Sequence, residues 1–445
     1  MKNFILETTV STAMDEMIEE YVVDWKFMGA VLVCMNGEIL LKKGYGFANL
    51  EWEIPNTPST KFQIASVSKQ FTAAAIFLLQ DQGKLNVNDL VKQYLPDSPD
   101  AWNKITILHL LTHTAGIHTY NDADVLNYFT PTRKIECTPE NILEMFLSKP
   151  LEFEPGERFA YSNSGFVVLG RIIEKISGQS YGKFLQENLF GPLGMENSGH
   201  LSYKEILKNR ADGYDQCNGE LQNSDLFDIA ICYACGSLYS TVEDLLKWVQ
   251  GLFAGKLLNE STLQQMITPF KDNYACGLEV TPEKGRKVIR HKGKTPGFKS
   301  VLSYYPDDQL IVTVLSNNEY GSATFEIARM VASIARNEEI ILLRQRKEIP
   351  LASETILDYV GEYRRDDGMI VAIIPLSEKL MVWMKKPDEQ STPVQDIYWI
   401  SAESESRFFS RDRVDVEIEF FRNDKRDVSH ILLRQDKQSM KAVRQ

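Results

Sequence analysis

The start of the chain changes from a helical pattern of apolar positions to a pattern typical of strands. Between Thr9 and Trp25 the apolar residues recur at helical spacing, with acidic residues between them, so this segment is predicted to be an amphipathic helix. In residues 30–48, Asn36-Gly37 stands between two runs of β-prone residues. Asn-Gly is the strongest short signal for a hairpin turn, and we therefore expect an antiparallel sheet to begin here.

Most of the middle of the chain follows helical spacing, interrupted by turns rich in Gly, Pro and Asn. A second hairpin is predicted further on, with its turn at Pro306 to Asp308, followed by an apolar helix over 323–335. Strands at both ends with helices between them predict one sheet built from distant parts of the chain and covered by helices. The helices expected in the middle span residues 66–82, 105–113, 139–147, 165–177 and 181–189, and another has Ser240 or Thr241 as its N-cap.

The last part of the chain has a different pattern. After a charged stretch over 336–350, short alternating runs of apolar and polar residues recur from Ile356 onward, at the spacing of an all-β sandwich or small barrel. We therefore predict an α+β fold, with an antiparallel sheet flanked by helices, a mainly helical region and a small all-β C-terminal domain. The predicted boundaries are 1–340 for the first domain, 341–355 for a linker and 356–445 for the β domain.

Composition and charge then narrow the class of protein. A chain of 445 residues with 43% hydrophobic and 25% charged residues has the length for more than one domain and the composition of a globular protein with a substantial core. The net charge of -12 disfavours a nucleic acid or an anionic membrane surface as the main partner. No apolar run approaches the roughly 20 residues that span a bilayer, and the first residues lack the apolar core of a signal peptide. As given, the chain is expected to be cytoplasmic, or periplasmic or secreted if a leader was removed.

The six cysteines are predicted to be small buried side chains rather than a disulfide framework, because several lie inside apolar strings. Cys232 and Cys235 form a Cys-x-x-Cys pair, but no second pair or nearby His completes a zinc site. His109 and His113 have the i, i+4 spacing of metal ligands on a predicted helix, yet residue 110 is Leu where an HExxH site needs Glu. We therefore expect neither a metal nor another cofactor.

The segment FQIASVSKQFTAAAIFLLQDQG, residues 62–83, contains the first candidate for chemistry. If a helix begins near Ser66, Lys69 lies on the same face, with Cβ atoms about 5–6 Å apart, while Ser68 points elsewhere. A serine becomes a strong nucleophile when a neighbouring base removes its proton, and a helix N-terminus favours the resulting negative charge. Taken alone, the segment fits better with Ser66 as an N-cap and Lys69 as a solvated side chain, so other stretches must decide.

The stretch around Tyr161 supplies the first supporting groups. Tyr161 and Asn163 precede an amphipathic helix that would hold them on a loop. A phenol beside a lysine ammonium would relay protons, and an amide would orient a substrate carbonyl. Taken alone, Tyr161 fits better with a packed aromatic side chain whose hydroxyl is hydrogen-bonded.

The stretch His291-Lys292-Gly293 supplies the second set, since it leads into the second predicted hairpin. Gly293 would let an edge strand approach a substrate closely. A backbone N–H of that strand, together with the N–H of Ser66, would form a two-donor oxyanion hole. The three stretches together favour a catalytic interpretation of Ser66 over a helix cap.

In this order, the stretches resemble the serine β-lactamase and penicillin-binding protein superfamily, most closely its class C branch, which also includes esterases, D-aminopeptidases and related serine peptidases. The resemblance covers Thr9 to Ala335. Together its motifs are far more specific than any one alone. They are ASVSK at 65–69, LLTHTAGI at 110–117, YSN at 161–163 (continuing as YSNSGFVVLGRIIEKISG) and GSLYSTVEDLLKW at 236–248.

The resemblance implies a role for each site residue. Ser66 would be the acylated nucleophile, Lys69 its partner, Tyr161 the general base and acid, and Asn163 a substrate-binding amide. The implied active site lies between the sheet and the helical region, and the tail resembles lipocalin-like or other β-barrel domains of some peptidase members. The implied partner is a small-molecule or peptide substrate, such as an ester, a D-amino-acid amide or a β-lactam.

One departure from the family pattern bears on the substrate. His291 stands where β-lactamases and penicillin-binding proteins have the lysine of a Lys-Thr-Gly strand, although His291 and Gly293 are still expected to bind substrate. A lysine would hold an anionic carboxylate, whereas His291 would be only partly charged at neutral pH. Lys292 and Lys294 would restore positive charge only if they turned inward. Esterase and D-amino-acid peptidase relatives often show His-x-Gly here, so these activities are favoured over strong β-lactamase activity.

Two other functions stay open at this stage. The altered third motif is also compatible with a non-catalytic or slow-turnover protein that binds penicillin or peptides on the same fold. In the remaining alternative, the β-rich tail is the functional centre and binds a ligand or a partner. The sequence indicates no oligomeric state.

Overall fold

The chain divides into two compact units, which are described separately: residues 1–320 with 327–337, and residues 321–326 with 338–445. The boundaries predicted from the sequence stay predictions, and residues 341–347 of the predicted linker lie outside the described residues. The computed structural model describes residues 2–445 except 121–124, 126–136, 203, 218–219, 226–227, 284, 320–322, 339–347, 377–378, 386–395, 411–415 and 436–437.

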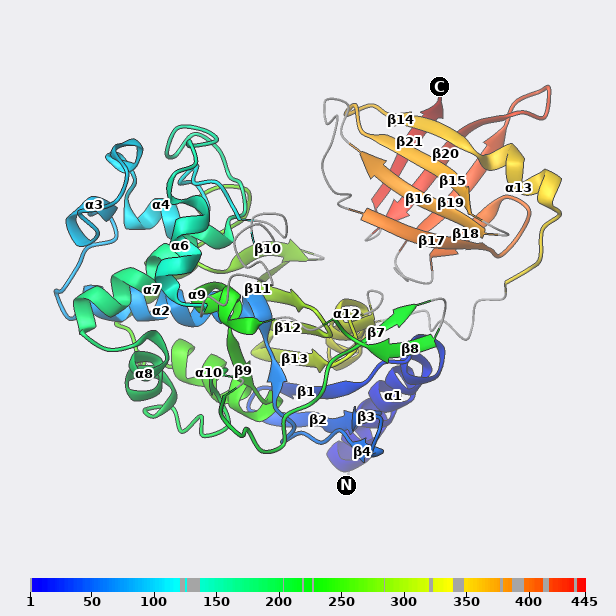
Figure 1. Cartoon of the computed structure of the whole chain (residues 1–445). Coiled ribbons are helices and arrows are strands. Elements are labelled where there is room, and N and C mark those ends of the chain that lie inside the picture. Colours follow the sequence, from blue (N-terminus) through cyan, green and yellow to red (C-terminus); the bar gives the residue numbers. More distant parts are fainter. Residues whose placement is uncertain are drawn as a thin grey trace. The chain divides into compact units, whose positions relative to one another are not determined.

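A six-stranded antiparallel sheet forms the framework of the first unit, in the order β10-β11-β12-β13-β1-β2 (Figure 1). The first and the last hairpins meet where β1 pairs with β13, so the sheet is assembled from both ends of this unit, as the sequence predicted. Its strands are β1 Gly29–Met35, β2 Glu38–Tyr45, β10 Glu279–Glu283, β11 Arg286–Thr295, β12 Phe298–Tyr305 and β13 Leu310–Ser316.

The Asn36-Gly37 turn has the geometry that its sequence predicts. Both residues have positive φ, 52° and 83°, as a type I′ turn requires, and asparagine and glycine adopt this region at low cost. The second hairpin turns through a short 3₁₀ segment, Pro306–Asp308, and then Gln309 at φ 46°. Both predicted hairpins are therefore confirmed.

The helices of the first unit cover the sheet and build a helical region beside it (Figure 1). Helix α1 packs on β2, and α10 packs on β1 and β13, while α2, α7 and α9 pack on one another. The predicted helix 181–189 is α-helical only to Leu185 and continues as a π turn to Phe190, and α11 was not predicted. The helices are α1 Lys2–Trp25, α2 Ser68–Asp81, α3 Val91–Tyr94, α4 Ile107–Leu111, α6 Pro139–Leu147, α7 Asn163–Ser177, α8 Tyr181–Leu185, α9 Tyr233–Gly236, α10 Val242–Phe253, α11 Glu260–Ile267 and α12 Ala323–Ala335.

Helix α2 lies inside the core, which explains its run of small and apolar residues. Most of its side chains are buried, and the Phe71 ring lies 4.0 Å from the Trp248 ring and 5.5 Å from the Phe190 ring, centre to centre. Trp248 also donates its indole N–H to Gln70 Oε1 at 3.2 Å. Short strands bind the surrounding loops: β3 Phe47–Asn49, β4 Ile54–Pro55, β5 Phe62–Gln63, β6 Gly199–His200, β7 Tyr214–Cys217, β8 Glu220–Asn223 and β9 Leu238–Ser240.

The second unit is a closed antiparallel barrel of eight strands, preceded by helix α13, Ser353–Tyr359. Its core contains a cluster of aromatic rings from Tyr359, Tyr363, Phe408 and Phe420. The predicted α+β fold with a small all-β C-terminal domain is confirmed, and the closed sheet decides for a barrel. Its strands are β14 Gly361–Arg365, β15 Ile370–Leu376, β16 Lys379–Lys385, β17 Asp396–Ala402, β18 Arg407–Ser410, β19 Glu417–Arg422, β20 Val428–Gln435 and β21 Gln438–Arg444.

Gly293 allows β11 to pack tightly against the segment before α2. A Cβ atom at this position would lie 2.3 Å from Ser300 Oγ and 2.4 Å from the carbonyl oxygen of Ile64. Ser300 Oγ in turn donates to that same carbonyl at 2.7 Å. The absence of a side chain at Gly293 therefore sets how closely the sheet approaches residues 64–66.

We expect Gly293→Ala to lower the free energy of unfolding of the first unit by about 1–3 kcal/mol, the usual cost of forcing extra atoms into a packed site. Lys294→Ala is the matched control, because this side chain is on the same strand and 62% exposed; it should change stability by no more than about 0.5 kcal/mol. Urea unfolding checks both values. Equal stability of the two variants would contradict the packing described.

Candidate active site

Ser66 lies in a single 3₁₀ turn, Ala65–Val67, that runs directly into α2. The N-cap positions of this turn and of α2 are Ile64 and Val67, and neither makes a side-chain capping hydrogen bond. Ser66 Oγ instead accepts a hydrogen bond from Lys69 Nζ at 3.0 Å. The structure therefore pairs Ser66 with Lys69 and does not use it as a helix cap.

The neighbouring serine has a different contact. Ser68 is fully buried, and its Oγ accepts a hydrogen bond from the backbone N–H of Leu238 at 3.2 Å. It ties the start of α2 to β9 and points away from Lys69. The two serines of the segment are thus separated, as the sequence predicted.

Ala65, directly before Ser66, has a left-handed backbone with φ 45°. This region costs energy for a residue with a Cβ atom, and such strain is concentrated at functional sites. The conformation is held by the tight packing of β11, since a Cβ at Gly293 would lie only 3.1 Å from the Ala65 Cβ. The packing of β11 against Ala65 therefore helps to fix the backbone at Ser66.

Lys69 is completely buried and donates to three acceptors. Its Nζ lies 3.0 Å from Ser66 Oγ, 2.9 Å from Asn163 Oδ1 and 2.8 Å from the carbonyl oxygen of Cys235. A lysine ammonium has three N–H donors and no acceptor, so its hydrogen-bonding capacity is filled. This pattern fits a charged Lys69 that donates to Ser66.

The YSN stretch is held at the start of α7. Ser162 is the N-cap of this helix, with its Oγ accepting from the N–H of Gly165 at 3.4 Å. This cap leaves Asn163 facing Lys69, and it places the Tyr161 ring centre 4.8 Å from Lys69 Nζ. Tyr161 is 40% exposed, so its phenol is accessible from solvent, unlike Lys69.

The stretch 291–293 lies on β11, beside the turn that carries Ser66. Within the described sheet, β10 pairs with β11 only as far as Arg290, whereas β12 pairs with it up to Thr295. In the described residues, one edge of 291–295 therefore makes no ladder with another strand. Such an edge offers backbone N–H and C=O groups to an extended ligand.

His291 itself is buried rather than at the surface of the site. Its exposed fraction is 3%, and its Nε2 and Nδ1 lie 2.9 Å from Tyr274 Oη and 2.7 Å from the Lys292 carbonyl oxygen. Burial and, to a smaller extent, the charge of Lys69 lower the pKa of His291 to about 4. His291 is therefore neutral at neutral pH, and the partial charge expected from the sequence is corrected.

Lys292 and Lys294 lie on the same stretch, and each has a carboxylate near it. Lys294 Nζ forms an ion pair with Glu319 Oε1 at 3.2 Å. Lys292 contributes, together with His291 and Arg290, to a lowered pKa of Glu279, although burial of that carboxyl group opposes the shift. Both cations thus have carboxylate neighbours.

Two further side chains lie near the site: His113, which the sequence suggested as a structural residue of its motif rather than a metal ligand, and Tyr274, which was not assigned a role. His113 Nε2 and His291 Nε2 both lie within hydrogen-bond distance of Tyr274 Oη, at 3.1 and 2.9 Å. Tyr274 had no signal beyond its aromatic character. His113 belongs to the LLTHTAGI motif, which was the available clue.

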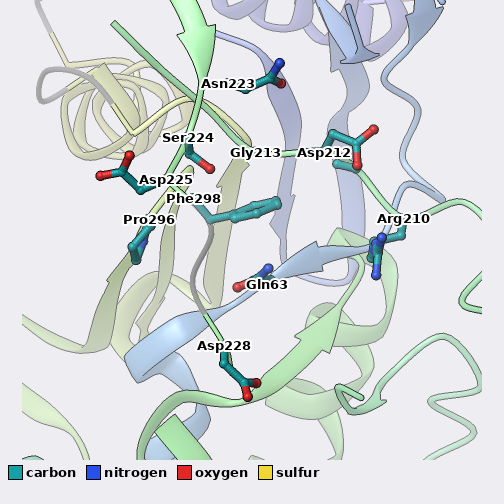
Figure 2. A pocket seen from close by; sticks show the side chains of 11 residues that line it. Gln63, Arg210, Asp212, Gly213, Asn223, Ser224, Asp225, Asp228, Pro296 and Phe298 are labelled. Atoms are coloured by element: carbon teal, nitrogen blue, oxygen red, sulfur yellow. The ribbon is translucent and has the colours of Figure 1, made fainter. Parts of the chain in front are cut away.

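The first unit also contains a cavity of about 840 Å³ (Figure 2). Its wall includes Gln63, shortly before Ser66, and Phe298, shortly after Gly293, so it adjoins both segments in the chain. Three aspartates and one arginine make its polar surface mainly acidic. The labelled lining residues are Gln63, Arg210, Asp212, Gly213, Asn223, Ser224, Asp225, Asp228, Pro296 and Phe298.

Among the described residues, no three or more His, Cys, Asp or Glu side chains are grouped so that they could hold a metal ion. Cys235 instead contributes its backbone carbonyl to Lys69. Its thiol lies 3.4 Å from Tyr120 Oη. Among the described helices, none has the length and hydropathy to cross a membrane.

Comparison with known proteins agrees with this geometry. The chain is 29% identical to penicillin-binding protein 4* of Bacillus subtilis over 426 residues, which cover 88% of this chain and 90% of that protein. Among solved structures, a penicillin-binding protein from Bacillus halodurans is 30% identical, with a TM-score of 0.63, covering 71% of this chain and 98% of that one.

A D-amino acid amidase from Ochrobactrum anthropi SV3 shares the fold, at 22% identity and a TM-score of 0.65, over 74% of this chain and 99% of that one. The family model described as Beta-lactamase matches residues 14–336, which include all six predicted site residues. On this match, and on the arrangement of Ser66, Lys69 and Asn163, the chain belongs to the beta-lactamase family.

Proposed function

We propose that the protein is a serine hydrolase that forms an acyl-enzyme on Ser66. The observation that carries the proposal is the hydrogen bond from the buried Lys69 ammonium to Ser66 Oγ, with the Tyr161 phenol beside it. The substrate would be an ester, an amide or a β-lactam-like compound. An esterase or D-amino-acid peptidase activity is favoured over strong β-lactamase activity.

The resemblance to the class C branch assigns the general base to Tyr161, and its ring centre, 4.8 Å from Lys69 Nζ, supports this role. Lys69 contacts Ser66 Oγ, Asn163 Oδ1 and the Cys235 carbonyl oxygen, and as an ammonium it has no lone pair for the Ser66 proton. It stabilises negative charge on Ser66 Oγ instead. Tyr161, beside this cation, would take the proton and return it as the general acid.

The reaction would then proceed in two steps, acylation of Ser66 and hydrolysis of the acyl-enzyme. Ser66 Oγ bonds to the acyl carbon while its proton moves to Tyr161, and the bond to the leaving group breaks as Tyr161 protonates that group. Water repeats the sequence on the acyl-enzyme, releasing the acid and regenerating Ser66. Backbone N–H groups of Ser66 and of the free edge of β11 would bind the oxyanion.

The surroundings of His291 support the preferred substrate class. A neutral, buried imidazole offers no positive charge to a substrate carboxylate, in contrast to the lysine of a Lys-Thr-Gly strand. The strand β11 beyond Arg290, where β10 no longer pairs with it, would accept an extended acyl chain or peptide. The amidase neighbour places D-amino-acid amides in the panel to be tested.

A second candidate function rests on the same neutral His291 and on the relatives named as penicillin-binding proteins. In that case Ser66 is acylated, but the acyl group leaves slowly and the protein acts as a receptor for penicillin or peptide. A panel of p-nitrophenyl esters, nitrocefin and D-alanyl amides separates the two functions. Multiple turnovers on any of them support the hydrolase, and a single equivalent on all of them supports the receptor.

A fluorophosphonate probe is expected to add one covalent adduct to the wild-type chain, because it reacts with activated serines. Ser66→Ala should abolish the adduct. Ser68→Ala is the matched control and should retain the adduct, since the Ser68 hydroxyl accepts from the backbone N–H of Leu238. Intact-mass spectrometry reads all three proteins, and an adduct that persists in Ser66→Ala would contradict the assignment of the nucleophile.

Tyr161→Phe is expected to lower kcat/KM by about 10²- to 10⁴-fold, the usual contribution of a general acid or base. The ring is 40% exposed, so loss of its hydroxyl should change stability by no more than about 0.5 kcal/mol. Steady-state kinetics on the best ester of the panel, with a thermal melt as the control, measures both. Unchanged kinetics would exclude Tyr161 as the proton carrier.

A further inference from the structure

We propose that His113, Tyr274 and His291 form a directed hydrogen-bond chain that positions Tyr161 relative to β11, with the two histidines held in opposite neutral tautomers. This inference rests on the proposed function for its effect on rate. For neutral rings, the two tautomers follow from the contacts within this hydrogen-bond chain.

The direction of the chain is set at its first member. The backbone N–H of Ser162 donates to His113 Nδ1 at 3.1 Å, and a backbone amide can only donate. His113 Nδ1 is therefore the acceptor, and the proton of a neutral ring must be on Nε2. That Nε2–H then donates to Tyr274 Oη at 3.1 Å.

The second half of the chain follows from the first. Because Tyr274 Oη already accepts from His113, its own O–H is free to donate to His291 Nε2, at 2.9 Å. This acceptor role places the His291 proton on Nδ1. The Nδ1–H donates to the Lys292 carbonyl oxygen at 2.7 Å, which ends the chain on the backbone of β11.

Both histidines have reasons to stay neutral. Burial comes first, followed by the charge of Lys69, and together they lower the pKa of His113 well below its usual value and that of His291 to about 4. Glu279 acts in the opposite direction on His291 and Lys292 adds to the lowering.

Protonation would also break the direction of the chain. A charged His291 would present an Nε2–H to Tyr274 Oη, which already accepts the Nε2–H of His113. The tyrosine hydroxyl would then face two donors and lose its acceptor. The Tyr161 ring also lies near His291, with 6.3 Å between the two ring centres.

His113 binds the backbone N–H groups of the two residues that flank Tyr161. Its carbonyl oxygen accepts from the N–H of Ala160 at 2.9 Å, and its ring accepts from the N–H of Ser162. The Tyr161 ring packs on the His113 ring with 4.3 Å between centres. A shift of His113 would therefore move the phenol directly.

His291 holds the other end, on the strand that approaches Ser66. It precedes Gly293 by two positions, at the point where β11 loses its β10 partner. Tyr274 is thus the link between the loop of the proton carrier and the strand that would bind the substrate. Removal of the Tyr274 hydroxyl alone would break this link.

We expect Tyr274→Phe to lower kcat for ester turnover by about 10- to 100-fold, the scale of a small misplacement of reacting groups, with little change in KM. The phenyl ring keeps its contacts with Phe159 and His113. Tyr305→Phe is the matched control: it is also buried in this unit, and it also loses one side-chain hydrogen bond, to Glu283 at 3.1 Å. It should keep kcat within about twofold, since it lies outside the chain.

The tautomers are tested without any substitution or substrate. In a ¹⁵N-histidine spectrum of the wild-type protein, we expect His113 as the Nε2–H form and His291 as the Nδ1–H form, with neither ring titrating between pH 8 and pH 5. Single His→Gln variants assign the signals. A ring that titrates near pH 6.5, or the same tautomer for both histidines, would overturn the chain.

The outcomes separate this inference from the function on which it rests. If Ser66 is never acylated, the proposed function fails and the histidine spectrum still decides whether the chain exists. If the wild type turns over and Tyr274→Phe is equally fast, the positioning role is wrong. If Tyr274→Phe and Tyr305→Phe lose the same rate and the same stability, the effect is general packing, and the positioning role is again rejected.

Discussion

The site depends on the burial of one charged group, the ammonium of Lys69. An isolated ammonium away from water is very costly unless its hydrogen bonds are satisfied. Here the acceptors come from three separate segments, through Ser66, Asn163 and the carbonyl of Cys235. The 3₁₀ turn, the start of α7 and α9 must therefore all be in place before Lys69 can be buried.

The same charge shapes the rest of the site. Burial lowers the pKa of His113 and of His291, and the charge of Lys69 adds to this lowering. Among the described residues of the site, Lys69 is the cation that contacts Ser66 Oγ, and the neutral His291 adds no second buried charge beside it.

Local signals in the sequence were sufficient for much of the fold, and they located the segments that meet at the candidate site. Asn36-Gly37 predicted its turn because only a few residues adopt two consecutive positive φ angles, and the motif order brought Ser66, Lys69 and Tyr161 together. The role of Tyr274 was not predictable, because it arises from long-range packing. The neutral state of His291 was missed for the same reason, since its pKa is set by burial and by the charge of Lys69, which is far from His291 in the sequence.

The most direct measurement is an acid-quenched reaction of the wild-type protein with a p-nitrophenyl ester, followed by peptide mapping. We expect a burst of about one p-nitrophenol per chain and an acyl group on the peptide that contains Ser66, the kinetic and chemical signs of an acyl-enzyme. Nitrophenol release that starts without a burst and leaves no acylated Ser66 peptide, or an acyl group found on another residue, would contradict the proposed mechanism.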